Sequence, residues 1–241
     1  MIICLDSGNT RIKWGVHDGV QWLVQGALAQ ADVNQLGGVL ATASPKPERI
    51  VLANVAGPEA GERIRQQLSA WLPVLSEVRS SSRRCGVTNL YSKPESLGVD
   101  RWCALIGARS LVRGAAVVVM AGTATTIDTL DADAQFLGGV ILPGFELMAG
   151  SLARGTAALP LASGEYSIHP RCTDDAIVSG LVEAQAGAIE RIFSRLKNPG
   201  GDCLLSGGHA EQLAHHLVIP HRIAHNLPLE GLKQIAFEKR Q

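Results

Sequence analysis

Apolar residues along the chain alternate between short runs, typical of strands, and longer stretches with helical spacing. In the first half, the short runs cover residues 2–5, 11–16, 21–26, 50–55 and 75–79. Helical spacing occurs at 33–44 and at 61–72, where Ile64, Leu68 and Leu72 would share one face. Residues 97–112 predict a further helix that is closed by Gly114, because glycine commonly ends helices.

The second half repeats this order of elements. It predicts strands at 115–120, 126–130, 135–142 and 202–208, with a turn of small and polar residues at 122–126. It also predicts helices at 145–157, 174–197, 210–217 and 229–239. Such a mixture implies two α/β halves, and a cleft between two halves is a usual place for a ligand. We expect one domain at 1–114 and another at 115–241, with the terminal helix crossing back onto the first.

Composition and charge exclude several classes of protein. The 241 residues include 22 basic and 22 acidic side chains, and no Lys/Arg-rich run supplies the field that attracts nucleic acid. The longest apolar run, AAVVVMAG, is too short to span a bilayer. Asp6 interrupts the first apolar run and no basic segment precedes it, which predicts no signal peptide. Five scattered cysteines without a CxxC pair fit reduced thiols, so we expect a cytoplasmic protein. From its charge and its short apolar runs we expect neither nucleic-acid nor membrane partners.

The stretch DSGNT at residues 6–10 has two interpretations. Ser7, Gly8 and Asn9 suit a tight hairpin turn, since Gly and Asn tolerate positive φ. That interpretation does not account for Asp6, or for two basic residues that alternate with apolar ones just beyond it. A turn lined by backbone N–H groups, an acid and two bases could instead hold a phosphate and its metal ion.

The turns DSGNT and GTATT occupy equivalent places in the two halves and resemble the phosphate loops of the acetate/sugar kinase, Hsp70 and actin superfamily. Further motifs narrow the resemblance: DSGNTRIKWG at 6–15, YSKPESLGVDRW at 91–102, AGTATTID at 121–128, FLGGVILPG at 136–144, TAALP at 156–160, TDDAIVSG at 173–180 and SGGHA at 206–210. In this order and spacing, over nearly the whole chain, they are similar to the type III pantothenate kinases. The resemblance implies an α/β fold with two ribonuclease-H-like (actin-like ATPase) domains of similar plan, facing each other across a cleft. It also implies phosphorylation of pantothenate by ATP to 4′-phosphopantothenate, the first step of coenzyme A biosynthesis.

The same resemblance implies roles for individual residues. Asp6 would hold Mg²⁺, most simply through water, because a hard carboxylate oxygen suits that ion. The other nucleotide contacts would come from Ser7, Gly8, Asn9, Thr10, Arg11, Ile12, Lys13 and Thr123. Pantothenate would contact Tyr91, Gly98, Val99, Asp100, Arg101 and Thr173, the last from the second subunit of a homodimer. Without the resemblance, Thr123 reads as an ordinary β-turn threonine.

Asp100 is the expected catalytic residue. A carboxylate within hydrogen-bond reach can orient a primary alcohol and accept its proton as the new bond forms. Judged on the residues alone, Asp100 reads instead as a helix N-cap, since it stands just before an amphipathic run. The resemblance of YSKPESLGVDRW favours catalysis. Arg101 could pair bidentately with a carboxylate or a phosphate.

One position departs from the family pattern. The family commonly has an aspartate three residues before the first threonine of GTATT, where it binds potassium or ammonium. This chain has Met120 there, and a thioether is a poor ligand for a hard cation. We therefore expect the monovalent-cation site to be absent or altered.

Other features leave alternatives open. His169, Cys172, His215 and His216 have no spacing that assembles a metal site, so we expect surface histidines. Residues 205–208, LSGG, fit either the adenosine end of a nucleotide site or a plain strand-to-helix turn, and Asp128 is given no role. Two other functions remain possible at this point: a superfamily kinase for another small alcohol, or a non-catalytic accessory or regulatory protein on the same fold.

Overall fold

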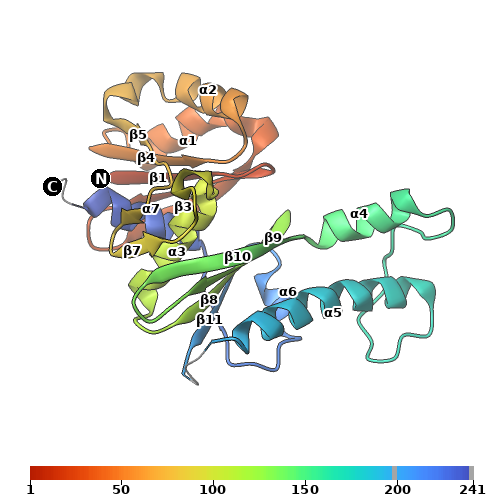
Figure 1. Ribbon diagram of the computed structural model, residues 1–241. Helices are drawn as coiled ribbons and strands as arrows, with labels where there is room; N and C mark the ends of the chain where they lie inside the picture. The colour runs from red at the N-terminus through yellow and green to blue at the C-terminus, as the bar shows by residue number, and fades with distance from the viewer. Residues whose placement is uncertain (197–199, 239–241) are drawn as a thin grey trace. The chain divides into compact units, whose positions relative to one another are not determined.

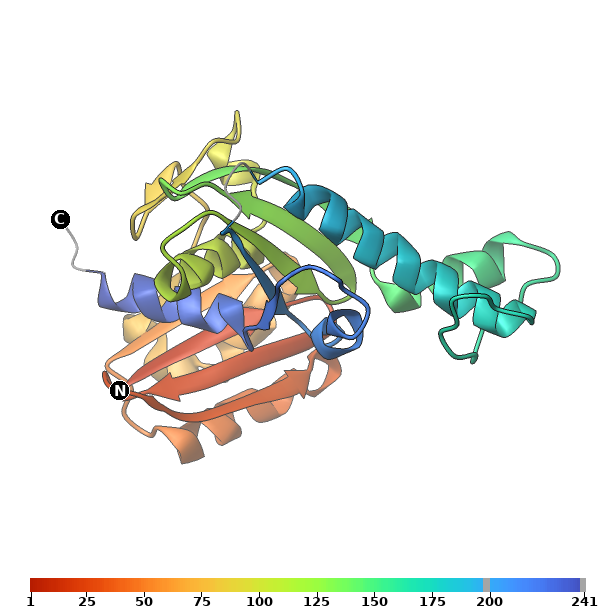
Figure 2. The ribbon, with the colours of Figure 1, turned by 90° about the horizontal axis from the view of Figure 1, so that it is seen from below.

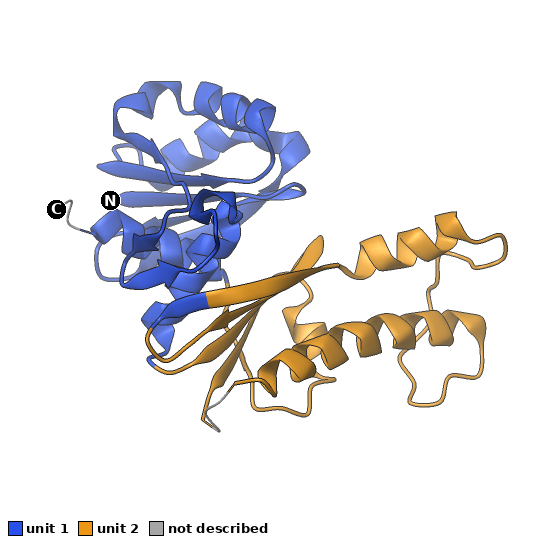
Figure 3. Cartoon of the chain, viewed as in Figure 1, with its two compact units in different colours: residues 1–113, 134–136, 226–241 blue, residues 114–133, 137–225 orange. Residues whose placement is uncertain are grey.

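The computed structural model describes residues 1–196 and 200–238, which form a mixed α/β fold with two sheets (Figure 1). Internal contacts divide the chain into two compact units (Figure 3). Unit 1 contains residues 1–113, 134–136 and 226–241, and unit 2 contains residues 114–133 and 137–225.

The sheet of unit 1 has five strands in the order β3-β2-β1-β4-β5. They are β1 (Ile2–Ser7), β2 (Arg11–His17), β3 (Trp22–Ala29), β4 (Arg49–Asn54) and β5 (Leu75–Glu77). The first three pair antiparallel, whereas β4 is parallel to β1 and β5 is parallel to β4. The helical segments beside them are η1 (Gln30–Gln35), α1 (Leu36–Ala43), α2 (Pro58–Gln67) and η2 (Ser69–Val74).

Alternation along β1 assigns its side chains to two faces of the sheet. Ile3 and Leu5 pack into a buried cluster with Leu36 of α1 and Ile64 of α2. Because successive side chains of a strand point to opposite faces, Cys4 and Asp6 belong to the other face. Two helices lie there, α3 (Val99–Leu111) and α7 (Leu227–Phe237). Asp6 is therefore a polar residue on a helix-covered face.

The helices α3 and α7 lie side by side in both views (Figures 1 and 2). Two glycines permit this approach. A Cβ atom on Gly231 would lie 1.8 Å from the Cys103 carbonyl oxygen, and one on Gly107 would lie 2.3 Å from the Leu227 carbonyl oxygen. Unit 1 is completed by β6 (Arg83–Arg84), β7 (Val87–Asn89) and η3 (Pro94–Ser96), and β7 pairs parallel with the first residues of β10 (Gln135–Pro143).

Unit 2 contributes β12, β11, β8, β9 and most of β10 to a seven-stranded sheet of order β12-β11-β8-β9-β10-β7-β6. Its strands are β8 (Ala116–Ala121), β9 (Ala124–Leu130), β10 (Gln135–Pro143), β11 (Asp202–Ser206) and β12 (Arg222–Ile223). Its helices are α4 (Phe145–Gly155), α5 (Thr173–Phe193) and α6 (Ala210–Ala214). Val117 and Val119 of β8 pack against Leu181 and Ile189 of α5 in one buried cluster. The helix α4 packs on the N-terminal part of α5, and both extend beyond the sheet (Figure 1).

The predicted order of strand, turn, two strands and helix is confirmed at the start of each half. Three details differ. The strand β9 begins at Ala124, so the second turn is shorter than predicted. Leu72 is 47% exposed, because Pro73 places it in the separate segment η2 rather than on the face of α2. The short strands β6, β7 and β12 show no periodicity that a sequence pattern could detect. The predicted helix ends at 197 and 239 lie outside the described residues.

Candidate active site

The turn between β1 and β2 lies at the carboxyl end of β1. Asp6 is paired with Lys13 and Ser7 with Ile12 across the hairpin, and the Gly8 N–H donates to the Arg11 carbonyl oxygen at 3.0 Å. Asn9, Thr10 and Arg11 are exposed, whereas Ile12 is fully buried in the core. The Ile12 side chain therefore cannot contact a ligand in the turn, and only its backbone could do so.

One residue that the sequence did not single out holds this turn, and a second holds the neighbouring loop after β4. Gln30, which follows β3, donates through Nε2 to Ser7 Oγ and to the Gly8 carbonyl oxygen, both at 2.8 Å. Asn54, which is paired with Ser7 at the end of β4, donates to the Gly57 carbonyl oxygen at 2.8 Å. A search for polar residues at the ends of β3 and β4 would have found both.

Asp6 is a buried carboxylate at the base of the turn. It is 8% exposed, and its Oδ1 has no hydrogen-bond partner among the described residues. Burial, reinforced by the negative charge of Asp100, raises the pKa of Asp6 to about 7, while the positive charge of Lys13 opposes this rise. A buried oxygen without a partner is costly unless a ligand satisfies it. Asp6 therefore fits a site that receives a cation.

Asp100 lies in the first turn of α3, close enough for its charge to act on Asp6. The N-cap of α3 is Gly98, not Asp100, and no side chain among residues 1–196 and 200–238 caps this end. Asp100 Oδ1 accepts a hydrogen bond from the Arg101 N–H at 2.8 Å. The N-cap interpretation of Asp100 is therefore wrong, and its carboxylate is half-buried near the first turn motif.

The segment before α3 places an aromatic residue beside Arg101. The rings of Tyr91 and Phe136 are 5.1 Å apart, and the buried Arg101 guanidinium lies 5.9 Å from the centroid of each. Asn89 shapes this segment: its Oδ1 accepts from the Tyr91 N–H and its Nδ2 donates to the Pro94 carbonyl oxygen, both at 3.0 Å. The sequence did not single out Asn89. Gly98 and Val99 complete the same segment and are half-buried.

Unit 2 holds the second turn motif, at Gly122 and Thr123. The Gly122 N–H donates to the Ala124 carbonyl oxygen at 3.1 Å, and the Gly144 N–H donates to the Thr123 carbonyl oxygen at 2.9 Å. A Cβ atom on Gly144 would lie 2.2 Å from the Gly122 carbonyl oxygen. The Thr123 side chain is exposed at the tip of the turn.

The LSGG segment, residues 205–208, lies against the carboxyl end of β8. Gly207 has φ of 103°, and a Cβ atom there would lie 2.2 Å from the Ala121 carbonyl oxygen. Met120 is a half-buried residue of β8, between Thr126 of β9 and Ser206 of β11. Asp128 is fully buried on β9.

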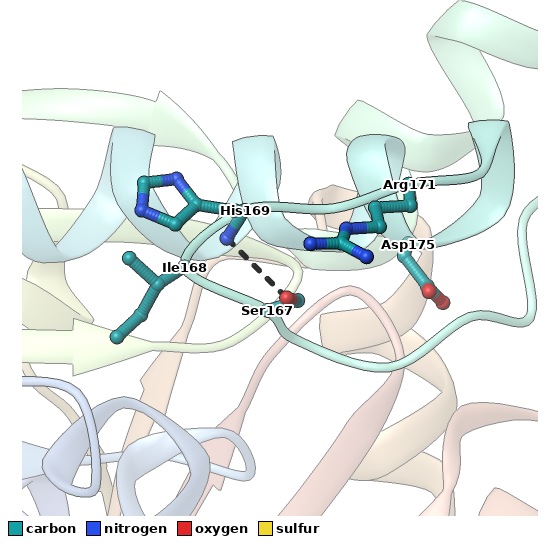
Figure 4. Close-up of a pocket in the computed structure, with 5 residues that line it drawn as sticks. All are labelled: Ser167, Ile168, His169, Arg171 and Asp175. Carbon is teal, nitrogen blue, oxygen red and sulfur yellow. Dashed lines mark hydrogen bonds between the residues drawn. The ribbon is translucent and has the colours of Figure 1, made fainter.

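Thr173 is the first residue of α5 and is exposed. The chain just before and after it surrounds a hollow of about 530 Å³, lined by Ser167, Ile168, His169, Arg171 and Asp175 (Figure 4). His169 and Cys172 are exposed, whereas the His216 ring lies 4.2 Å from that of Tyr166.

The predicted site residues are divided between the two units. Unit 1 contains Asp6 to Lys13 and Tyr91 to Arg101, and unit 2 contains Thr123 and Thr173.

Neither a protein-built metal cluster nor a membrane helix occurs in residues 1–196 and 200–238. No group of three or more His, Cys, Asp or Glu side chains there could hold a metal ion. No helix of this part of the chain is long and apolar enough to cross a bilayer.

Comparison with known proteins decides the family. The profile of the type III pantothenate kinases matches residues 2–195. The chain belongs to the type III pantothenate kinase family. A type III pantothenate kinase of Dechloromonas aromatica is 71% identical over 238 residues, covering 99% of this chain and 100% of the relative. That of Aromatoleum aromaticum is 51% identical over 239 residues, covering 99% and 98%.

Solved structures at low identity show the fold. A Sinorhizobium meliloti protein named as a 2-dehydro-3-deoxygalactonokinase superposes with a TM-score of 0.64 at 14% identity, covering 98% of each chain. A Campylobacter jejuni protein named for the Baf family of transcriptional activators gives 0.58 at 20% identity, covering 97% of this chain and 96% of that one. The predicted actin-like ATPase and sugar kinase fold is confirmed.

Proposed function

We propose that Asp6 and Asp100 divide the work of the pantothenate kinase reaction between them. Family membership establishes the reaction, the phosphorylation of pantothenate to 4′-phosphopantothenate for coenzyme A biosynthesis. The observation that carries the assignment is the buried Asp6 oxygen, which has no partner in the described part of the chain and lies beside a turn, within electrostatic reach of a second carboxylate.

Asp6 fits Mg²⁺ better than it fits a structural ion pair. Mg²⁺ is commonly held by one or two carboxylates together with substrate phosphates and waters, so a single acid suffices. When bound, the ion neutralises charge on the β- and γ-phosphates of ATP. N–H groups of the 7–10 turn other than that of Gly8, together with the side chains of Arg11 and Lys13, are proposed to contact phosphate oxygens. Thr123 is likewise proposed to contact the nucleotide.

Asp100 acts as general base. Its carboxylate accepts the proton of the pantothenate primary hydroxyl as that oxygen bonds to the γ-phosphorus and the bond to the ADP oxygen breaks. Tyr91, Gly98, Val99 and Arg101 hold pantothenate beside it. These roles are supported by the shared location of the residues in unit 1 and by their match to the family motifs.

The functional unit is proposed to be a cytoplasmic homodimer in which Thr173 serves the pocket of the partner subunit. The α4–α5 region carries large apolar side chains in water, with Leu147 43%, Leu161 70% and Ile168 78% exposed. We take the exposure of these three side chains as support for an interaction site in this region. Burial of this region in a second copy would remove them from water.

An assay of ADP release with ATP and pantothenate tests the assignment of Asp100. The variant Asp100→Asn keeps the shape but cannot accept the proton, so kcat should fall by about 10²–10⁴-fold with the fold intact. Turnover like that of the native chain in a folded Asp100→Asn variant would show that another group is the base. A panel of other small alcohols separates pantothenate from other acceptors, and absence of any turnover would favour a regulatory protein.

A further inference from the structure

Gln30 binds three of the four residues of the first turn. Its side-chain Nε2 donates to Ser7 Oγ and to the Gly8 carbonyl oxygen, both at 2.8 Å. Its backbone N–H donates to the Thr10 carbonyl oxygen at 3.0 Å. The side chain is half-buried and enters the turn from the end of β3.

These bonds fix the direction of the peptide groups in the turn. A peptide unit is planar and trans, so its N–H points opposite to its C=O. The Gly8 carbonyl is directed to Gln30, and the Asn9 N–H is therefore directed away from it. The Thr10 carbonyl also meets Gln30, which directs the Arg11 N–H the opposite way. Ser7 Oγ accepts from Gln30 and thus keeps its own hydrogen for donation.

The hairpin itself does not need the Gln30 side chain. The Gly8 N–H already donates to the Arg11 carbonyl oxygen at 3.0 Å, and backbone pairing holds β2 against β3. A hairpin with Gly and Asn in its turn is closed by these backbone bonds alone. The two side-chain bonds of Gln30 therefore do something other than closing the hairpin, namely selecting one arrangement of its N–H donors.

We propose that Gln30 is a positioning residue for the nucleotide phosphates, acting through Ser7 and Gly8. This inference rests on the proposed function of the 7–10 turn. A primary amide suits this position, because its one nitrogen donates both hydrogen bonds, to Ser7 Oγ and to the Gly8 carbonyl oxygen. A carboxylate of the same shape supplies none, and the shorter asparagine would not reach both acceptors.

The test compares Gln30→Glu, Gln30→Ala and Gln30→Asn with the control Gln35→Ala. Gln35 is an exposed glutamine at the other end of η1. The measurements are the calorimetric Kd for ATP, the KM for each substrate and the melting temperature. We expect Gln30→Glu and Gln30→Ala to weaken ATP binding and raise the KM for ATP roughly tenfold, the usual effect of losing one or two hydrogen bonds. The KM for pantothenate and the melting temperature should stay close to native, Gln30→Asn should be intermediate, and Gln35→Ala should match the native chain.

Two results would overturn the inference. One is ATP binding of native strength in Gln30→Glu, and the other is a fall in melting temperature with both KM values unchanged. If Gln30→Glu does not fold, Gln30→Ala decides by the same criteria. A double variant with Ser7→Ala should be less impaired than the product of the single effects, because Gln30 acts through Ser7. Failure of the proposed function gives a different pattern, in which Asp6→Asn also binds and uses ATP like the native chain.

Discussion

Asp6 and Lys13 are direct partners across the β1–β2 hairpin, yet the positive charge of Lys13 does not lower the pKa of the Asp6 carboxyl to its usual value. Burial and the negative charge of Asp100 outweigh Lys13 and raise the pKa of Asp6 from 3.8 to about 7. Ionised Asp6 at this buried position lowers the stability of the folded chain, so the residue does not serve stability. Strongly shifted pKa values are typical of functional sites, so this shift supports the proposed cation site at Asp6.

The first prediction concerns the stability of the ligand-free chain. The folded chain holds the Asp6 proton more tightly than the unfolded chain, so stability falls as pH rises from about 4 to about 7. The penalty at pH 8 is on the order of 4 kcal/mol. Asp6→Asn should therefore raise the melting temperature at pH 8 by roughly 5 °C or more while abolishing activity.

The pH dependence provides the control for Asp6→Asn. At pH 5 Asp6 is mostly protonated, so the difference in melting temperature between variant and native chain should shrink. The exposed Asp32→Asn should show no such difference at either pH. An Asp6→Asn variant that is less stable than the native chain at pH 8 would contradict the prediction, since it would show that Asp6 has a favourable partner.

The second prediction concerns Gly98. A Cβ atom there would lie 2.7 Å from Asp100 Oδ1, closer than real atoms come. In Gly98→Ala the carboxylate has to move, so kcat should fall about tenfold or more, because small displacements of a catalytic group are costly. Gly38→Ala is the matched control, since Gly38 is an exposed residue of α1 with open space around it. Steady-state kinetics of both variants decide, and an unchanged kcat in Gly98→Ala would show that the position of Asp100 is not critical.

The third prediction concerns Asn89. Its two hydrogen bonds hold the segment that carries Tyr91. Asn89→Ala should raise the KM for pantothenate about tenfold and leave the KM for ATP unchanged, because the proposed nucleotide contacts do not include this segment. Asn89→Asp keeps the acceptor for the Tyr91 N–H and should be intermediate. The exposed Ser92→Ala in the same segment is the control, and a rise of both KM values in Asn89→Ala would indicate general loosening instead.

The sequence predicted the elements well and the supporting residues poorly. Apolar runs and helical patterns located β1, β2, β4, α3 and α5, because each buries apolar side chains. The run at 21–26 also located β3, although no residue of that strand is buried. Motifs located Asp6 and Asp100. The roles of Gln30 and Asn89 could not be predicted from the sequence. Gln30 contacts a turn 22 residues away, and Asn89 contacts the loop that follows a short strand. Neither kind of contact has a periodicity in the sequence.

The fourth prediction tests whether the functional unit is a dimer. If Thr173 serves the partner's pocket, an inactive Asp100→Asn chain mixed with an inactive Thr173 variant should form heterodimers with one unimpaired site. Activity should return on subunit exchange, in proportion to the heterodimer measured by native mass spectrometry. Heterodimers without activity would show that each pocket is built from one chain.

The last prediction concerns Met120. A carboxylate at this end of β8 would offer a hard oxygen and a negative charge to K⁺, and methionine offers neither. We expect activity to change little when KCl is replaced by the salt of a bulky organic cation at constant Mg²⁺. Ionic strength has to be matched, because screening of the phosphates would otherwise imitate an effect of the ion. The variant Met120→Asp is the converse test and should make activity respond to K⁺. Loss of native activity without K⁺ or NH₄⁺, restored at millimolar addition, would show that other groups provide the site, and the inference from Met120 would then be wrong.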